Sequence, residues 1–281
     1  ENSEGSVSEA TRLSPTISCV MPCYNCADTL DRSVKSILAQ SVQVAEILLV
    51  DDCSSDETLR LITLLEQTDP RIVGIRMAEN GGPARARNVG WERATGTFVA
   101  FLDADDTWHP QKLELQLRLL DRHPELAIVG HLVDVCVNFG VYETFELTDH
   151  DLEARSRRIS SRSALIRNPW STPSVLLRRD LAIRFDEDLR AAEDYLLWAQ
   201  ILCTSNKGMC LDLPLARLYK ARYGASGLSG NLWEMEKGEL QVIRKLHTRG
   251  NISFWLRLVL SMYSLVKFLR RKVLTTWSIL D

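Results

Sequence analysis

Three aspartates within four positions, Asp103, Asp105 and Asp106, directly follow the apolar run over 98–102. Carboxylates this close repel one another unless a cation sits between them. Hard oxygen ligands at the end of a buried strand suit Mg²⁺ or Mn²⁺, because these ions prefer carboxylate ligands. The segment therefore predicts a metal site that faces a ligand with negative charge of its own. The alternative is a solvated acidic turn after a strand.

Two other apolar runs also end in polar side chains. Tyr24 and Asn25 follow the first run of the chain, and Asp51 and Asp52 end the run over 47–50. The ligand crevice of an open parallel sheet lies outside the carboxyl ends of its strands, so all three clusters are expected around one cleft. There the Tyr24 ring can stack on a flat base, and an aspartate can accept hydrogen bonds from a base or a ribose. The simpler role of Asp51 and Asp52 is to cap the following helix.

Two further segments have the composition of ligand-binding elements. The turn over 80–83 contains two glycines and a proline, which lets the backbone approach a ligand closely. Arg85 and Arg87 follow on the next predicted helix, where arginines suit a diphosphate; solvated arginines are the alternative. Glu193 and Asp194 begin another predicted helix. A carboxylate there can act as a general base, or it can simply be stabilised by the helix dipole.

Other chemistries find less support. Cys23 and Cys26 form a C-x-x-C pair where a thioredoxin-like redox site would lie, but that hypothesis leaves the acidic clusters without a role. The five histidines show no H-E-x-x-H pattern, so zinc hydrolysis is not indicated. Seven scattered cysteines, an odd number, predict free thiols in a reducing cytosol rather than a disulfide framework.

The length and the net charge of the chain limit which classes of protein it can belong to. The 281 residues allow one large α/β domain or two closely packed ones. The formal net charge of −3 argues against a protein that binds nucleic acid through its overall field. The first sixteen residues are mostly polar and lack the basic start and apolar run of a secretory signal. We therefore expect no export and a cytoplasmic location.

Apolar runs of strand length alternate with amphipathic stretches of helix length as far as about Val129, which predicts repeated βαβ units and a mostly parallel sheet flanked by helices. The predicted strands cover 17–22, 45–51, 72–77, 97–102 and 126–130, and the predicted helices cover 27–39, 55–66, 83–94 and 110–122. Ser54 and Glu57 resemble a capping box at the start of the second helix. A less regular stretch over 131–190 precedes a helix over 191–203, a strand over 209–213, a loop over 224–230 and a helix over 231–248.

The terminal segment over 252–280 is apolar and aromatic, but five cations interrupt it before it reaches the roughly 20 apolar residues of a membrane span. On a helical wheel its polar residues form one stripe, namely Arg257, Ser261, Ser264, Lys267 and Arg271. This pattern predicts an in-plane helix on a membrane surface, with peripheral contact through 252–281. The alternative is a helix docked on the domain or in a homo-oligomer.

Four segments, 20–25, 46–54, 80–88 and 103–110, jointly resemble the family 2 glycosyltransferases. The resemblance covers roughly 17–125 and, more loosely, 193–198. It implies an α/β fold of the GT-A type, with a Rossmann-like, mostly parallel central sheet and a C-terminal helical extension. Two positions depart from the family pattern. Cys53 stands where a glycine is usual, which bears on the turn, and Leu196 stands where an acidic residue is frequent, which bears on the position of the base.

The resemblance also implies roles for individual residues. The implied donor-binding set is Pro22, Tyr24, Asn25, Asp51, Asp52, Gly82, Arg87, Asp103 and Ala104. Within it, Asp52, together with Asp51, would meet the uracil or the ribose. Asp103 and Asp105 would be the DxD pair that holds Mn²⁺ or Mg²⁺, with Asp105 as the direct ligand. Asp194 would be the catalytic base.

The implied reaction is an inverting, metal-dependent transfer of a hexose or N-acetylhexosamine. The expected donor is a nucleotide sugar, with a UDP-sugar as the first choice. The acceptor would be a glycan or a polyprenyl-diphosphate-linked glycan in cell-surface polysaccharide synthesis, at the cytoplasmic face of the inner membrane. The arginine-rich stretch over 155–184 and the basic terminal helix motivate an anionic acceptor. The expected parts are a flexible segment 1–16, a nucleotide-sugar-binding half 17–130, an acceptor-binding half 131–230, and C-terminal helices 231–281 that contact a membrane or form a dimer.

Two alternative functions remain open at this stage. A sugar-phosphate nucleotidyltransferase uses a similar fold and metal, but the chain shows no early glycine-rich, lysine-bearing phosphate loop. A non-catalytic nucleotide-sugar binder would have a decayed site, whereas the carboxylates at 103, 105 and 194 are all present. Incubation with a nucleoside triphosphate and a sugar phosphate tests the first alternative, and release of UDP from a panel of donors tests the second.

Overall fold

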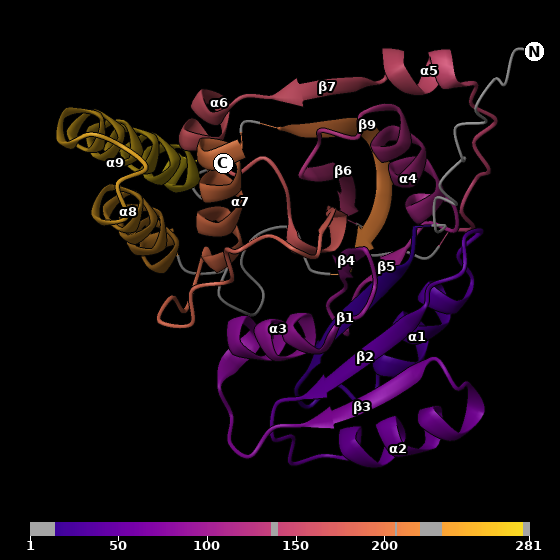
Figure 1. Ribbon diagram of the computed structural model, residues 1–281. Coiled ribbons are helices and arrows are strands. Elements are labelled where there is room, and N and C mark those ends of the chain that lie inside the picture. Colours follow the sequence, from indigo (N-terminus) through magenta and orange to yellow (C-terminus); the bar gives the residue numbers. More distant parts are fainter. Residues whose placement is uncertain (1–14, 136–139, 206, 220–231, 278–281) are drawn as a thin grey trace, which may run out of the picture.

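The computed structural model describes residues 15–135, 140–205, 207–219 and 232–277, arranged as in Figure 1. The strands are β1 Ile17–Cys23, β2 Glu46–Asp51, β3 Ile72–Arg76, β4 Phe98–Phe101, β5 Thr107–Trp108, β6 Ile128–Val135, β7 Ser156–Ile159, β8 Leu176–Arg178 and β9 Gly208–Leu218. The helices are α1 Leu30–Leu38, α2 Thr58–Thr68, α3 Gly82–Arg93, α4 Lys112–Arg122, α5 Asp149–Ala154, α6 Ser161–Ile166, α7 Glu193–Ser205, α8 Leu232–Thr248 and α9 Phe254–Trp277. The predicted loop 224–230 and most of the predicted segment 1–16 lie outside these ranges.

The strands form one sheet in the order β3-β2-β1-β4-β8-β6-β9-β5, and β7 pairs along β9. β1 pairs in parallel with both β2 and β4, and β2 pairs in parallel with β3. The carboxyl ends of these four strands therefore meet at one edge of the sheet. The predicted α/β fold, with a mostly parallel central sheet flanked by helices and a C-terminal helical part, is confirmed.

The sheet also contains strands that the sequence pattern does not predict. β8 runs antiparallel between β4 and β6, with Leu177 opposite Val99 on one side and opposite Ile128 on the other. A strand of three residues is too short to show the alternation by which strands are recognised. It therefore stays hidden within the irregular stretch 131–190. β6 continues to Val135, past the predicted boundary at residue 130.

Helices bury both faces of the sheet, which explains why the strands are continuous apolar runs. Successive side chains of β1 point to opposite faces. Met21 belongs to a core with Val34 of α1 and Leu119 of α4, and Val20 belongs to a second core with Trp91 of α3. The packing fixes the strand ends, because a shift of one residue would exchange the two cores.

The C-terminal helices form a separate layer. A third core joins α6, α7, α8 and α9 through Leu165, Leu196, Val242, Leu246 and Leu260. In Figure 1, α8 and α9 lie beyond α7, on the side of the molecule away from β1, β2 and β3. Within the ranges described, no helix combines the length and the hydropathy needed to cross a bilayer.

The second helix begins later than the sequence predicts. α2 starts at Thr58, and its N-cap residue Glu57 makes no capping hydrogen bond through its side chain. The Ser54 hydroxyl instead accepts the Asn25 N–H at 3.1 Å, and Asp56 accepts the Thr58 N–H at 3.0 Å. The predicted capping box of Ser54 and Glu57 is therefore wrong. Ser54 links two turns at the carboxyl edge of the sheet.

Candidate active site

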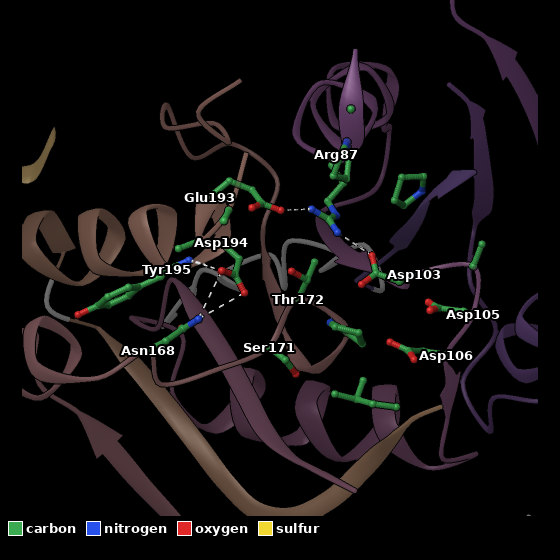
Figure 2. A pocket seen from close by; sticks show the side chains of 18 of the residues that line it. Arg87, Asp103, Asp105, Asp106, Asn168, Ser171, Thr172, Glu193, Asp194 and Tyr195 are labelled. Atoms are coloured by element: carbon green, nitrogen blue, oxygen red, sulfur yellow. Dashed lines mark hydrogen bonds and ion pairs between the residues drawn. The ribbon is translucent and has the colours of Figure 1, made fainter. Parts of the chain in front are cut away.

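A cavity of about 1370 Å³ opens at the carboxyl edge of the parallel strands, and Figure 2 shows it from close by. Ligand pockets for one drug-sized molecule measure about 300–1000 Å³, so this cavity has room for two ligands side by side. The predicted site residues that line it are Pro22, Tyr24, Asn25, Asp52, Gly82, Arg87, Asp103, Ala104, Asp105 and Asp194. Asp51 is not among the lining residues.

The turn after β1 places an aromatic ring at the cavity. Tyr24 is 53% exposed, which leaves its ring open to a flat ligand. Asn25 has a φ of 47°, in the left-handed region that asparagine tolerates better than most residues. Its side-chain oxygen accepts the Ser55 N–H at 2.9 Å. The turns after β1 and β2 are thereby locked together.

The two aspartates at the end of β2 have different neighbours. Asp51 is buried, and one of its oxygens accepts the Ser54 N–H at 3.2 Å. The carboxylate of Asp52 accepts the N–H groups of Gly81 and Gly82 at 2.7 and 2.8 Å. Asp52 therefore holds the N-terminus of α3 against the end of β2, at the wall of the cavity. Gly82 has a φ of 81°, a conformation that glycine adopts at little cost.

The acidic cluster after β4 has the composition of a divalent-cation site. Oxygen atoms of Asp103, Asp105 and Asp106 all lie within 4.8 Å of one another. These three carboxylates would hold a divalent cation, and the purely carboxylate donor set suits Mg²⁺ or Mn²⁺. The backbone of the cluster is held in place, because Arg32 donates to the Asp105 carbonyl at 2.6 Å and Ser33 donates to the Ala104 carbonyl at 2.8 Å.

Arg87 joins the acidic cluster to the start of α7. Its guanidinium donates to Asp103 at 2.7 Å and to Glu193 at 2.9 Å, as Figure 2 shows. Burial opposes the positive charge, but the two carboxylates outweigh it and raise the pKa of Arg87. The sequence suggests an arginine that is free to meet a diphosphate. In the structure, two of its nitrogens are already committed to carboxylates.

Asp194 also lines the cavity, at the first turn of α7. Its carboxylate accepts the Tyr195 N–H at 2.6 Å, and both of its oxygens lie 3.4 Å from the side-chain nitrogen of Asn168. Burial, reinforced by the neighbouring charge of Glu193, raises the pKa of Asp194 to about 7. A carboxylate that titrates near neutral pH is suited to accept a proton during a reaction.

The residue before this acidic pair is strained. Ala192 has a φ of 62°, in the left-handed region that costs a residue with a Cβ about 1–2 kcal/mol. Such conformations persist where the surrounding structure enforces them, and they gather at functional sites. The strained turn sets the direction in which Glu193 and Asp194 enter the cavity.

The cavity is also lined by residues outside the predicted set of site residues. Asn168, Ser171 and Thr172, from the connection between α6 and β8, form one wall, and the cations Arg167, Lys267, Arg270 and Arg271 line the cavity as well. The only sequence signals near the first group are the turn-prone Asn-Pro and Thr-Pro pairs. The cations of the terminal segment are prominent in the sequence, but their place at the cavity depends on how α9 packs.

The sheet topology, the acidic cluster after β4 and the carboxylate at the start of α7 define an α/β protein of the GT-A type. The chain belongs to glycosyl transferase family 2, because the model of that family, Glycosyl transferase family 2, matches residues 18–181. This assignment overturns the thioredoxin-like interpretation of Cys23 and Cys26, which lie on β1 and in the turn that follows it.

Curated relatives and solved structures agree with the family. The chain is 33% identical over 235 residues to the succinoglycan biosynthesis protein ExoO of Rhizobium meliloti, covering 75% of this chain but only 62% of that protein. It is 32% identical over 190 residues to the UDP-Glc:alpha-D-GlcNAc-diphosphoundecaprenol beta-1,3-glucosyltransferase WfgD of Escherichia coli, covering 68% of this chain and 71% of WfgD. The crystal structure of S. aureus TarS 1-349 in complex with UDP-GlcNAc shares the fold, with a TM-score of 0.64, 22% identity, and 82% of this chain and 66% of that one covered.

Proposed function

We propose that this protein transfers a sugar from a UDP-sugar to a hydroxyl of a glycan carried on a lipid diphosphate, with inversion at the anomeric carbon. The observation that carries the proposal is the arrangement of one cavity, in which the acidic cluster and Asp194 face the same space, connected through Arg87 and Glu193. The volume of about 1370 Å³ suits a nucleotide sugar and an acceptor together.

The donor end is proposed to lie at the carboxyl ends of β1, β2 and β4. Tyr24 would stack on the base, and the backbone held by Asp52 would border the ribose. The DxD residues Asp103 and Asp105 would hold a divalent cation, which, when bound, offsets the charge of the departing nucleoside diphosphate. The oxygen-only donor set favours Mg²⁺ or Mn²⁺. TarS, solved with UDP-GlcNAc, supports a UDP-sugar donor by its shared fold.

Asp194 is proposed to take the proton from the attacking hydroxyl. Its pKa of about 7 makes the ionised form accessible at neutral pH, while the Tyr195 N–H and Asn168 hold the carboxylate in one orientation. The attacking oxygen would approach the anomeric carbon from the face opposite the diphosphate, so one displacement inverts the configuration. A positioned base of this kind contributes about 10²–10⁴-fold in rate.

The acceptor proposal combines the cavity wall with a relative. The cations Arg167 and Arg270 line the cavity on the side of α6 and α9, and guanidinium groups bind phosphates well. The name of WfgD specifies an acceptor linked to a lipid diphosphate. The free cysteines of the described residues suit a reducing compartment, so we place the reaction on the cytoplasmic side of the membrane.

Release of UDP from a panel of UDP-sugars, with and without Mn²⁺ or Mg²⁺, tests the proposal. We expect release from at least one donor, with a dependence on the cation that Asp105→Ala abolishes. Asp194→Asn should keep donor affinity within about 2-fold, while turnover falls by about 10²-fold or more. Asp31→Asn, on the exposed face of α1, is the matched control. It should change neither donor affinity nor turnover.

Two results would contradict the proposal. Incorporation of a nucleoside triphosphate and a sugar phosphate into a nucleotide sugar, without UDP release, would identify a nucleotidyltransferase. Tight donor binding without release from any donor, in the presence of either cation and of a lipid-linked acceptor, would identify a binding protein.

A further inference from the structure

Helix α9 has its polarity reversed relative to an ordinary surface helix. A helix on a water-exposed surface packs its apolar stripe inward and presents its polar face to solvent. In α9 the polar stripe faces the protein: Ser264 is 1% exposed, and Arg257, Ser261, Lys267 and Arg271 are half-buried. The stripe is visible in the sequence, but the direction in which it points depends on the packing of α9.

The polar stripe of α9 is directed at α8, beside Leu260, which belongs to the third core. The Ser264 hydroxyl donates to Glu236 at 2.7 Å, and Glu236 is fully buried. Lys267 forms an ion pair with Glu239, and Arg271 lies 3.5 Å from both glutamates. Charge-assisted contacts of this kind hold α9 in one rotational setting. The opposite side of the helix is therefore fixed outward.

The outer face of α9 is apolar over about half of its circumference. We define this outer face by its exposed side chains, which are between 41% and 75% exposed: Phe254, Trp255, Leu258, Val259, Met262, Tyr263, Leu265, Val266 and Leu269. At 100° per residue they fill one continuous arc of the helix. α9 lies at the outer edge of the molecule in Figure 1. An apolar surface this extensive marks a site of contact with a protein or a membrane.

The charges of α9 distinguish between these two occupants. The helix carries five cations and no acidic residue over its 24 residues, in a chain whose net charge is −3. Arg270 and Lys272 are exposed beside the outer face. A two-fold contact between copies of this face would bring like charges together, whereas anionic headgroups would complement them. Trp255 and Tyr263 are residues that favour the boundary between lipid and water.

We propose that the outer face of α9 docks on the surface of an anionic lipid bilayer, with the helix lying in the plane of the membrane. Helices of this type bury their apolar face about 5–10 Å into the region between headgroups and acyl chains. The arc of half the circumference is wider than the narrow seam of a coiled-coil dimer. The same helix lines the reaction cavity with Lys267, Arg270 and Arg271.

Docking has a consequence for substrate access that rests on the proposed function. One helix would touch the bilayer and border the cavity, so the phosphate groups of a lipid-linked acceptor would meet the cations of α9 without leaving the membrane. The docking test uses neither donor nor acceptor. Its failure is therefore distinguishable from failure of the proposed reaction.

Flotation of the full chain with vesicles tests the docking. We expect the protein to float with vesicles of phosphatidylcholine containing about 30% phosphatidylglycerol, and to float less with phosphatidylcholine alone, because each cation near an anionic surface contributes about 1 kcal/mol, or about 5-fold in affinity. The double variant Val259→Glu with Met262→Glu should lower the vesicle partition coefficient by about 100-fold or more. Both side chains are exposed, so the thermal midpoint should not change.

The matched control places the same two charges elsewhere. Leu64→Glu with Val141→Glu changes exposed apolar residues outside α9 and should float as the unmodified protein does. Flotation unaffected by the α9 variant, or equal with both vesicle compositions, would overturn the proposal. So would a dimer in solution, measured by light scattering, that the α9 variant converts to monomer while flotation is absent throughout.

Discussion

The buried Arg87 of α3 and the partly exposed Asp103, which follows β4, form an ion pair with 2.7 Å between their closest nitrogen and oxygen atoms. The same guanidinium reaches Glu193 at 2.9 Å, 106 residues further along the chain. One cation thus joins the acidic cluster to the first turn of α7, where Asp194 lies. This side chain therefore links the proposed donor end of the cavity to the helix that carries the proposed base.

Replacing Arg87 should therefore destabilise the fold as well as the site. Arg87 is only 4% exposed, and Arg87→Met leaves two carboxylates without their cation. Removing one partner of a buried pair costs about 3–5 kcal/mol, so we expect the free energy of unfolding in urea to fall by about 3 kcal/mol or more. Arg85 lies two residues earlier and forms an exposed ion pair with Glu79. Arg85→Met should change the free energy of unfolding by less than about 0.5 kcal/mol. Equal effects at the two positions would refute the bridging role.

The pH dependence of turnover should follow Asp194. Its pKa of about 7 predicts that kcat/KM rises with pH and levels off above about 7, because the base acts as the carboxylate. Asn168 donates to both oxygens and holds that pKa down. In Asn168→Ala, the rise of kcat/KM on the acidic side of the pH profile should therefore occur at higher pH. A rise that stays at the same pH in this variant would show that another group controls it.

Asp194 also predicts a pH dependence of stability, with a defined sign. Its folded-state pKa lies above the unfolded value, so the folded chain binds a proton more tightly and stability falls as pH rises from about 4 through about 7. Asp194→Asn cannot ionise and should lose less stability over that range. Urea unfolding at about pH 5 and pH 8 gives the comparison. Parallel losses in both proteins would contradict the prediction.

The sequence predicts the carboxyl edge of the sheet well, because βαβ units place strand ends together. Tyr24, Asp52 and Asp105 stand at such ends, and all three line the cavity. The partners of those side chains are not predictable in the same way. Whether Arg87 is free or paired depends on Glu193, which only the tertiary packing of α7 brings within reach.

The direction in which the polar face of α9 points could not be predicted from the sequence either. A period of 3.6 residues shows that a helix has two faces, but it does not show which face meets the protein. The polar stripe points inward here, where the Ser264 hydroxyl donates to the fully buried Glu236. β8 illustrates a further limit, since a strand of three residues is defined by its neighbours rather than by its own pattern.

Lys112 should make the protein less stable near neutral pH than at alkaline pH. It is fully buried with its ammonium 4.0 Å from the centre of the Trp108 ring, and burial lowers its pKa to about 7 from the ordinary lysine value of 10.5. Between these values the unfolded chain binds a proton that the folded chain lacks, so stability rises with pH. Lys112→Met keeps the apolar stem and should be the more stable protein at pH 7, with a shallower slope up to about pH 10. Lys35→Met, on an exposed lysine of α1, should leave the slope unchanged.

Cys53 should be replaceable by glycine with a gain in stability. It follows Asp52 with a φ of 60°, and a side chain in this left-handed region costs about 1–2 kcal/mol. Glycine avoids that cost but loses about 0.5–1 kcal/mol more in chain entropy on folding. We expect Cys53→Gly to raise the free energy of unfolding by up to about 1 kcal/mol, with UDP-sugar affinity kept. At Ala39 φ is −83°, so glycine relieves no strain there and only adds the loss of chain entropy. Ala39→Gly should therefore lower the free energy of unfolding. A loss of equal size at both positions would mean that the turn after β2 is not strained.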